Sequence, residues 1–84
     1  MAYRIQLQQC AIKSIKKIPE PHKTHIKESI GRLEQFSKTM KNIKALQGEY
    51  KGLYRLRIGD YRIIFDVLET TIIILDIFIR QRGY

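Results

Sequence analysis

Residues 53–67 read LYRLRIGDYRIIFDV, and this stretch predicts the fold more strongly than any other part of the chain. Apolar and polar side chains alternate before and after Gly59-Asp60. A Gly-Asp dipeptide between two such segments is typical of the two-residue turn of a tight β-hairpin. We therefore expect strands over residues 53–58 and 61–67. The β-branched run that follows predicts a third strand of the same meander over residues 72–80.

The first half of the chain predicts one strand and two helices. Residues 3–8 alternate with a period of two, which is typical of a strand with one buried face. Isoleucines at 12, 15 and 18 form one face of a short helix that Pro19 ends, and Pro21 suits the first turn of a second helix. Along one side of that second helix runs an apolar stripe formed by Ile26, Ile30, Leu33 and Phe36.

Residues 37–51 lose both periods, and Gly48 interrupts them, so we expect a connection with room for one short turn. The order β-α-α-β-β-β then predicts the α+β class, with an antiparallel meander sheet packed against two helices. We expect one small domain over residues 1–84, because a chain of 84 residues has no room for a second core.

The composition favours a polyanionic or acidic partner. Sixteen Lys and Arg against eight Asp and Glu leave a formal charge of +8, and nucleic acid is the first partner expected of such an excess. A single cysteine cannot close an intramolecular disulfide, and no signal peptide or membrane span is recognisable. These features predict a cytoplasmic protein that acts away from the membrane.

Strand alternation separates a core face from a basic face. The residues expected beneath the helices are Tyr54, Leu56, Ile58, Tyr61, Ile63, Phe65, Val67, Ile73, Leu75, Ile77 and Ile79. The opposite face then gathers four arginines, Arg55, Arg57, Arg62 and Arg80. An ordinary solvated face balanced by Asp66 and Asp76 is the alternative reading. Four arginines against two aspartates favour phosphate binding, because the planar guanidinium suits bidentate contact.

The last residues, 80–84, read RQRGY. An aromatic ring can stack on an unpaired base while arginines hold its phosphates, so Arg82 and Tyr84 are further candidates for nucleic-acid contact. A frayed chain end is the alternative.

Two other groups are weaker candidates. His22 and His25 lie three residues apart on the second helix, but two histidines without a closed ligand set make a metal site improbable, so we expect no metal and no cofactor. Cys10 has no histidine in its segment, and a small buried thiol is the expected reading rather than a nucleophile.

The run GLYRLRIGDYRI at residues 52–63, followed by a strand ending in RQRGY, resembles the RelE/ParE superfamily of toxins from type II toxin-antitoxin pairs. The resemblance covers essentially the whole chain and implies a RelE-like fold. For the RelE-like branch it implies a metal-independent endoribonuclease that enters the ribosomal A site, cleaves mRNA there by attack of the 2′-hydroxyl, and inhibits translation. Its partners would be a cognate antitoxin protein and the ribosome with its mRNA and rRNA. ParE-like members instead inhibit DNA gyrase without cutting RNA, and a plain nucleic-acid-binding domain is a third alternative.

The residues of this chain that match the family's motif indicate which side chains would form its site. The resemblance implies catalytic roles for Arg57, Arg62, Arg80 and Tyr84, and RNA-binding roles for Arg55, Lys51 and Arg82. Arg57 stands where some relatives have lysine, and Ile79 stands where many have histidine. Since an arginine is a poor general base, the sequence provides for phosphate binding better than for proton transfer.

Overall fold

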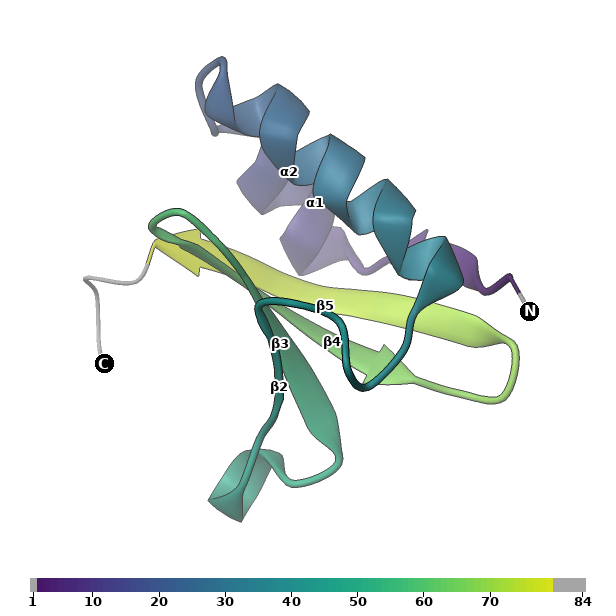
Figure 1. The fold of residues 1–84 in the computed structure, drawn as a ribbon. Coiled ribbons are helices and arrows are strands. Elements are labelled where there is room, and N and C mark those ends of the chain that lie inside the picture. Colours follow the sequence, from purple (N-terminus) through teal and green to yellow (C-terminus); the bar gives the residue numbers. More distant parts are fainter. Residues whose placement is uncertain (1, 80–84) are drawn as a thin grey trace.

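The computed structural model describes residues 2–79, which form two helices and a five-stranded sheet (Figure 1). The main elements, in chain order, are β1 (Arg4–Leu7), α1 (Gln9–Lys16), α2 (His22–Arg32), β2 (Ile43–Ala45), β3 (Leu53–Ile58), β4 (Tyr61–Val67) and β5 (Thr71–Ile79). Two single turns of 3-10 helix, η1 (Leu33–Gln35) and η2 (Gly48–Tyr50), complete the described chain. The predicted α+β class is confirmed.

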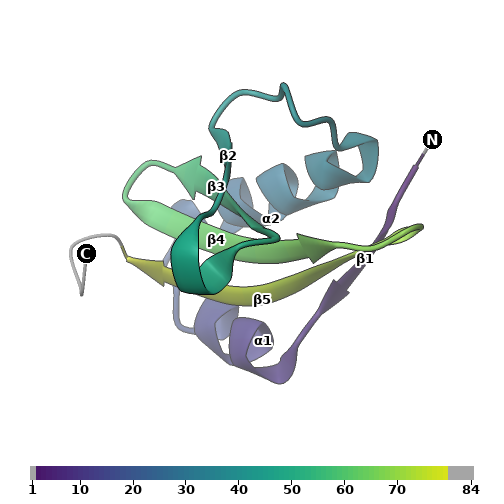
Figure 2. The same ribbon diagram turned by 90° about the horizontal axis from the view of Figure 1, so that it is seen from below.

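The sheet is mixed, with the strand order β1-β5-β4-β3-β2. β3, β4 and β5 form the predicted antiparallel meander, whereas β1 joins the edge of β5 in parallel. β1 and β2 lie at opposite edges, so the chain that joins them has to cross the sheet. Both α-helices belong to that crossing and cover the same face, so within residues 2–79 no α-helix covers the other face of the sheet (Figures 1 and 2).

The predicted hairpin is tight. Ile58 pairs with Tyr61, and Gly59 and Asp60 form the two-residue turn between them. Gly59 has a φ of 57°, in the left-handed region that side chains other than glycine rarely adopt. The glycine thus fixes the register in which β3 and β4 pair.

The core lies between the helices and the sheet, where the predicted stripes meet. Ile15 and Ile18 from the first helical segment and Ile26 and Ile30 from α2 are buried, as the apolar spacing predicted. Four aromatic rings pack beside them. Phe36 contacts Tyr3, Tyr54 and Phe65 edge to face, and Tyr54 stacks on Phe65. Phe36 directly follows η1, so this aromatic cluster packs the end of η1 against β3 and β4.

One part of the connection predicted over residues 37–51 is a strand. β2 pairs antiparallel with β3, with Ile43 opposite Leu56 and Ala45 opposite Tyr54. It has only three residues, of which the middle one is Lys44, so it is too short to show a period in the sequence. The short turn expected in the same connection is η2.

The predicted alternation along β5 is wrong for its first half. A register shift between Ile64 and Phe65 pairs Ile64 with Asp76 but Phe65 with Ile74, which leaves Leu75 as an extra residue. Such a bulge reverses the faces on one side of it, so Ile74 and also Ile72 are fully buried. Ile73 and Leu75, both expected in the core, are only partly buried. Beyond the bulge, Ile77 is buried as predicted, whereas Ile79 is exposed.

Within residues 2–79, no helix combines the length and the apolar character needed to span a membrane.

Candidate nucleic-acid interface

The helix-free face of the sheet carries three arginines in the described part of the chain. Arg55 and Arg57 are two residues apart on β3 and therefore point to the same face. Arg57 is the direct cross-strand partner of Arg62 on β4, and cross-strand partners share a face. Leu56, which lies between Arg55 and Arg57, and its cross-strand partner Ile63 are both buried in the core beneath the helices. The arginines therefore lie on the opposite side of the sheet, as the alternation predicted.

The Arg57–Arg62 pair opposes two positive charges. Side chains directly opposite each other on antiparallel strands have Cβ atoms about 4.5–5.5 Å apart, and like charges in such a pair are destabilising. The next residue in the row, on β5, is Phe78, the cross-strand partner of Arg62. Guanidinium groups bind phosphate oxygens in pairs, so two arginines on neighbouring strands of one face are suited to bind a phosphate.

Arg62 is held in place by the hairpin. Its side chain is only 8% exposed, and its Nη1 donates hydrogen bonds of 3.2 Å to the carbonyl oxygens of Gly59 and Tyr61. A guanidinium anchored to backbone in this way loses little further freedom when it meets a ligand. Preorganised charge of this kind stabilises developing negative charge most effectively.

Arg55 and Arg57 differ in exposure. Arg57 is exposed, whereas Arg55 is half-buried, and its buried Nε has no hydrogen-bond partner among residues 2–79. Leaving a buried donor unpaired costs about 1–3 kcal/mol. Lys44 on β2 is the direct partner of Arg55, so it continues the basic face toward the edge of the sheet. We call Lys44, Arg55, Arg57 and Arg62 the basic face.

The carboxylate of Asp76 accepts hydrogen bonds from α1 and from its own strand. Its Oδ1 accepts hydrogen bonds from the backbone N–H of Ile77 at 2.8 Å and from Cys10 Sγ at 3.5 Å. Cys10 is exposed, which corrects the expectation of a buried thiol. The hydrogen bond to Asp76 and the negative charge of that carboxylate raise the pKa of Cys10, so the reactive thiolate is disfavoured.

The two histidines lie away from the basic face. His22 packs against the ring of Tyr61 with ring centroids 5.7 Å apart. His22 and His25 line an open pocket of about 460 Å³ between α2 and the turn of the hairpin. Among residues 2–79, no three His, Cys, Asp or Glu side chains come together as a metal site would require.

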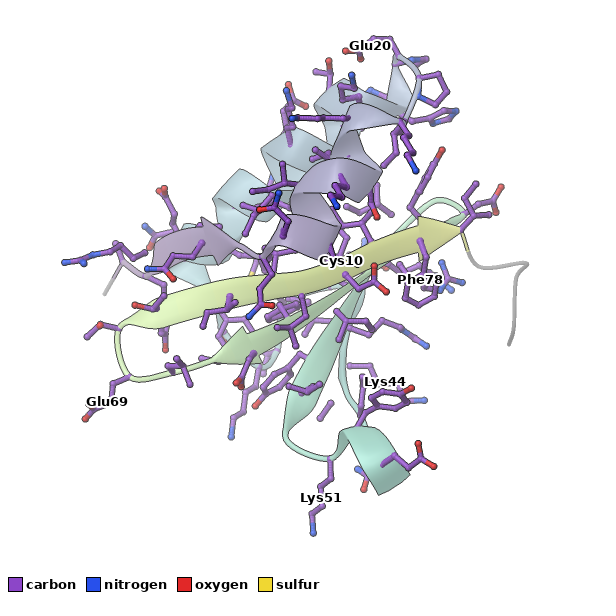
Figure 3. The ribbon with its side chains drawn as sticks, turned by 180° about the vertical axis from the view of Figure 1, so that it is seen from behind. Cys10, Glu20, Lys44, Lys51, Glu69 and Phe78 are labelled. Atoms are coloured by element: carbon purple, nitrogen blue, oxygen red, sulfur yellow. The ribbon has the colours of Figure 1, made fainter. Side chains whose placement is uncertain are left out.

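The other predicted site residues fall into two groups. Lys51 is exposed and follows η2, on the side of the sheet away from the helices (Figure 3). Arg80, Arg82 and Tyr84 lie outside the described residues, so their roles remain predictions. The last described residue of β5, Ile79, pairs with Tyr61 at the same end of the sheet as the Arg57–Arg62 pair.

Sequence reasoning missed Lys44 as a member of the basic face. The lysine joins that face only because β2 pairs with β3, and a three-residue strand leaves no period in the sequence. The alternation of β3 alone could not have shown it.

Comparison with known proteins assigns the chain to a family. The sequence profile of the family described as the ParE toxin of the type II toxin-antitoxin system, parDE, matches residues 5–84. The chain therefore belongs to this family of toxins. A search of curated protein sequences finds no match.

Solved structures agree with the family assignment. The archaeal RelE–RelB complex from Pyrococcus horikoshii OT3 contains a chain that is 30% identical, with 99% of this chain and 100% of that chain covered and a TM-score of 0.82. The antitoxin–toxin complex RelB–RelE from Methanococcus jannaschii gives 29% identity, coverage of 90% and 91%, and a TM-score of 0.75. The RelBE2 complex from Mycobacterium tuberculosis, at 24% identity, shares the fold with a TM-score of 0.81 over 95% of this chain and 100% of that chain. The predicted RelE-like fold is confirmed.

Proposed function

We propose that this toxin is an endoribonuclease that cleaves mRNA in the ribosomal A site and so inhibits translation. The observation that carries the proposal is the Arg57–Arg62 pair: the two arginines lie opposite each other across the hairpin, and two backbone carbonyls hold the guanidinium of Arg62. The likeness to RelE chains over nearly the whole length supports it.

The chemistry requires only the substrate's own nucleophile. The 2′-hydroxyl of a ribonucleotide loses its proton and attacks the adjacent phosphorus, while the bond to the 5′-oxygen breaks and that oxygen takes up a proton. The products are a cyclic phosphate and a 5′-hydroxyl. DNA lacks the attacking group and would not be cut.

The basic face divides this work between binding and transition-state stabilisation. Arg62 is buried and anchored, so with Arg80 it would stabilise the charge that builds on the phosphate oxygens. Arg55 and Arg57 would hold the RNA backbone, with Lys51 and Arg82 as further phosphate contacts. Tyr84 would stack on the nucleotide beside the cleaved bond. The ribosome would supply the orientation of the 2′-hydroxyl.

Control by an antitoxin follows from the same charges. A chain of formal charge +8, with a basic face that α1 and α2 do not cover, is suited to bind an acidic segment that folds on it. The related RelE chains come from complexes with RelB, which supports a cognate antitoxin for this chain. Covering Arg57 or displacing Tyr84 would block RNA.

Inhibition of DNA gyrase is the second candidate function, because the matching family is described as ParE toxins of parDE systems. A gyrase inhibitor could dispense with some of the arginines of the basic face, whereas a nuclease needs them around the phosphate. The deciding experiment induces the chain in cells and compares two readouts, cleavage of translated mRNAs within codons and gyrase-dependent DNA breaks. Codon cleavage that disappears in an Arg62→Ala variant supports the nuclease; DNA breaks with intact mRNA refute it.

A further inference from the structure

Tyr50 differs from every other tyrosine in the described chain. Tyr3, Tyr54 and Tyr61 each make a ring contact with another aromatic or histidine side chain. Tyr50 makes no such ring contact within residues 2–79 and is 50% exposed, more than any other large hydrophobic residue there. Packing in the core therefore does not explain this aromatic residue.

The backbone presents Tyr50 from a defined turn. η2 connects β2 to β3, and positive φ angles at Gly48 (69°) and Gly52 (100°) reverse the chain on either side of it. The N–H of Leu46 donates to the carbonyl of Leu53 at 2.9 Å, which extends the β2–β3 ladder to the base of the turn. In Figures 1 and 2, η2 lies on the side of the sheet away from the helices, the side of the basic face.

Two lysines lie near this turn. Residues 44–52 contain Lys44, Lys51 and one glutamate, Glu49. Lys51 directly follows Tyr50, and Lys44 lies opposite Arg55 in the β2–β3 pairing. The labelled side chains of Lys44 and Lys51 lie at this end of the molecule, below the sheet (Figure 3). The basic face therefore extends from Arg57 through Arg55 and Lys44 toward η2, and the acids near this path are Glu49 in the turn and Asp66, the cross-strand partner of Leu53.

An exposed aromatic ring beside lysines has the chemistry that binds single-stranded nucleic acid. The ring stacks on an unpaired base, and the cations neutralise the phosphates on either side. We propose that Tyr50 is a stacking site for an unpaired RNA base that flanks the cleaved nucleotide, with Lys44 and Lys51 as its phosphate contacts. The proposal deepens the nuclease function and rests on it for the identity of the nucleic acid.

The test measures binding separately from cleavage. The full chain is titrated into a fluorescent single-stranded oligoribonucleotide that carries 2′-O-methyl groups throughout, so that it cannot be cut by 2′-hydroxyl attack. Tyr50→Ala should bind about 5- to 150-fold more weakly, the equivalent of about 1–3 kcal/mol of stacking per base. Tyr50→Phe should bind like the wild type, since it retains the ring and also reports that the turn is intact.

Leu68→Ala is the matched control, because Leu68 is 47% exposed and lies in the turn between β4 and β5, where the neighbouring Glu69 is well separated from Lys51 (Figure 3). It should bind like the wild type. A second series replaces single nucleotides with abasic ones. At the position that stacks on Tyr50, the loss caused by Tyr50→Ala should disappear, since there is no base left to stack.

Each outcome decides the proposal. Failure of the wild type to bind, equal binding by wild type and Tyr50→Ala, or a loss that persists at every abasic position overturns it. A Tyr50→Ala chain that binds RNA normally but its antitoxin poorly would assign the turn to protein binding instead, and also overturns it. If Tyr50→Ala loses RNA binding while the wild type cuts nothing on ribosomes, the stacking site stands and the nuclease function fails.

Discussion

Arg62→Ala is the substitution that tests the proposed active site most directly. The change removes a guanidinium that is 8% exposed and that donates to the carbonyl oxygens of Gly59 and Tyr61 at 3.2 Å. If this preorganised charge stabilises the transition state, its loss should slow cleavage by about 10²- to 10³-fold. Association with the ribosome should survive, because Arg55, Arg57 and the lysines remain.

The cost of the same substitution to stability is smaller. Loss of the two hydrogen bonds lowers the free energy of unfolding by about 0.5–1.5 kcal/mol each. Removal of the like charge opposite Arg57 raises it by about 0.2–1 kcal/mol. The free energy of unfolding should thus fall by no more than about 3 kcal/mol. Small domains have about 5–15 kcal/mol in total, so the variant stays folded and a hundredfold loss of rate cannot come from unfolding.

The assay is single-turnover cleavage of mRNA on programmed ribosomes, with urea denaturation of each variant in parallel. Arg32→Ala is the matched control, because Arg32 is an exposed arginine at the end of α2 on the helix side of the molecule. Arg62→Lys keeps the charge but not the planar fork, so its rate should lie between those of the wild type and Arg62→Ala. Cleavage by Arg62→Ala within threefold of the wild type would refute the argument from preorganisation.

Three further predictions concern the chain end, the thiol and the core. Tyr84→Phe should cleave faster than Tyr84→Ala in the same assay, because stacking needs the ring and not the hydroxyl; equal inactivity of both variants would show that the phenol transfers a proton. Asp76→Asn should lower the raised pKa of Cys10, since it removes the negative charge that disfavours the thiolate, so the alkylation rate at pH 8 should increase; an unchanged rate–pH profile would contradict the Cys10–Asp76 contact. Phe65→Ala should lower the free energy of unfolding by about 3–5 kcal/mol in urea denaturation, because a fully buried ring leaves a cavity; a loss below about 1 kcal/mol would show that the aromatic cluster collapses into the space.

Much of the site could be predicted because it is built by local rules. Alternation along β3 places Arg55 and Arg57 together, and a two-residue turn at Gly59 forces Arg57 to pair with Arg62. Both rules act over a few neighbouring residues, so they are visible in a single sequence. The burial of Arg62 and its bonds to the turn carbonyls are not, since they depend on where a long side chain settles after the hairpin has formed.

The sequence by itself determined the two helices, the β3–β5 meander and the basic character of one sheet face, because side-chain periodicity and turn chemistry encode them locally. Only the tertiary structure decided that β1 runs parallel to β5, that three residues around Lys44 form an edge strand, and that Leu75 is an extra residue in β5. Each of these depends on a partner strand distant in the sequence. A bulge in particular reverses every face on one side of it, so the buried positions of Ile72 and Ile74 follow from the pairing with β4 and not from the period of β5 itself.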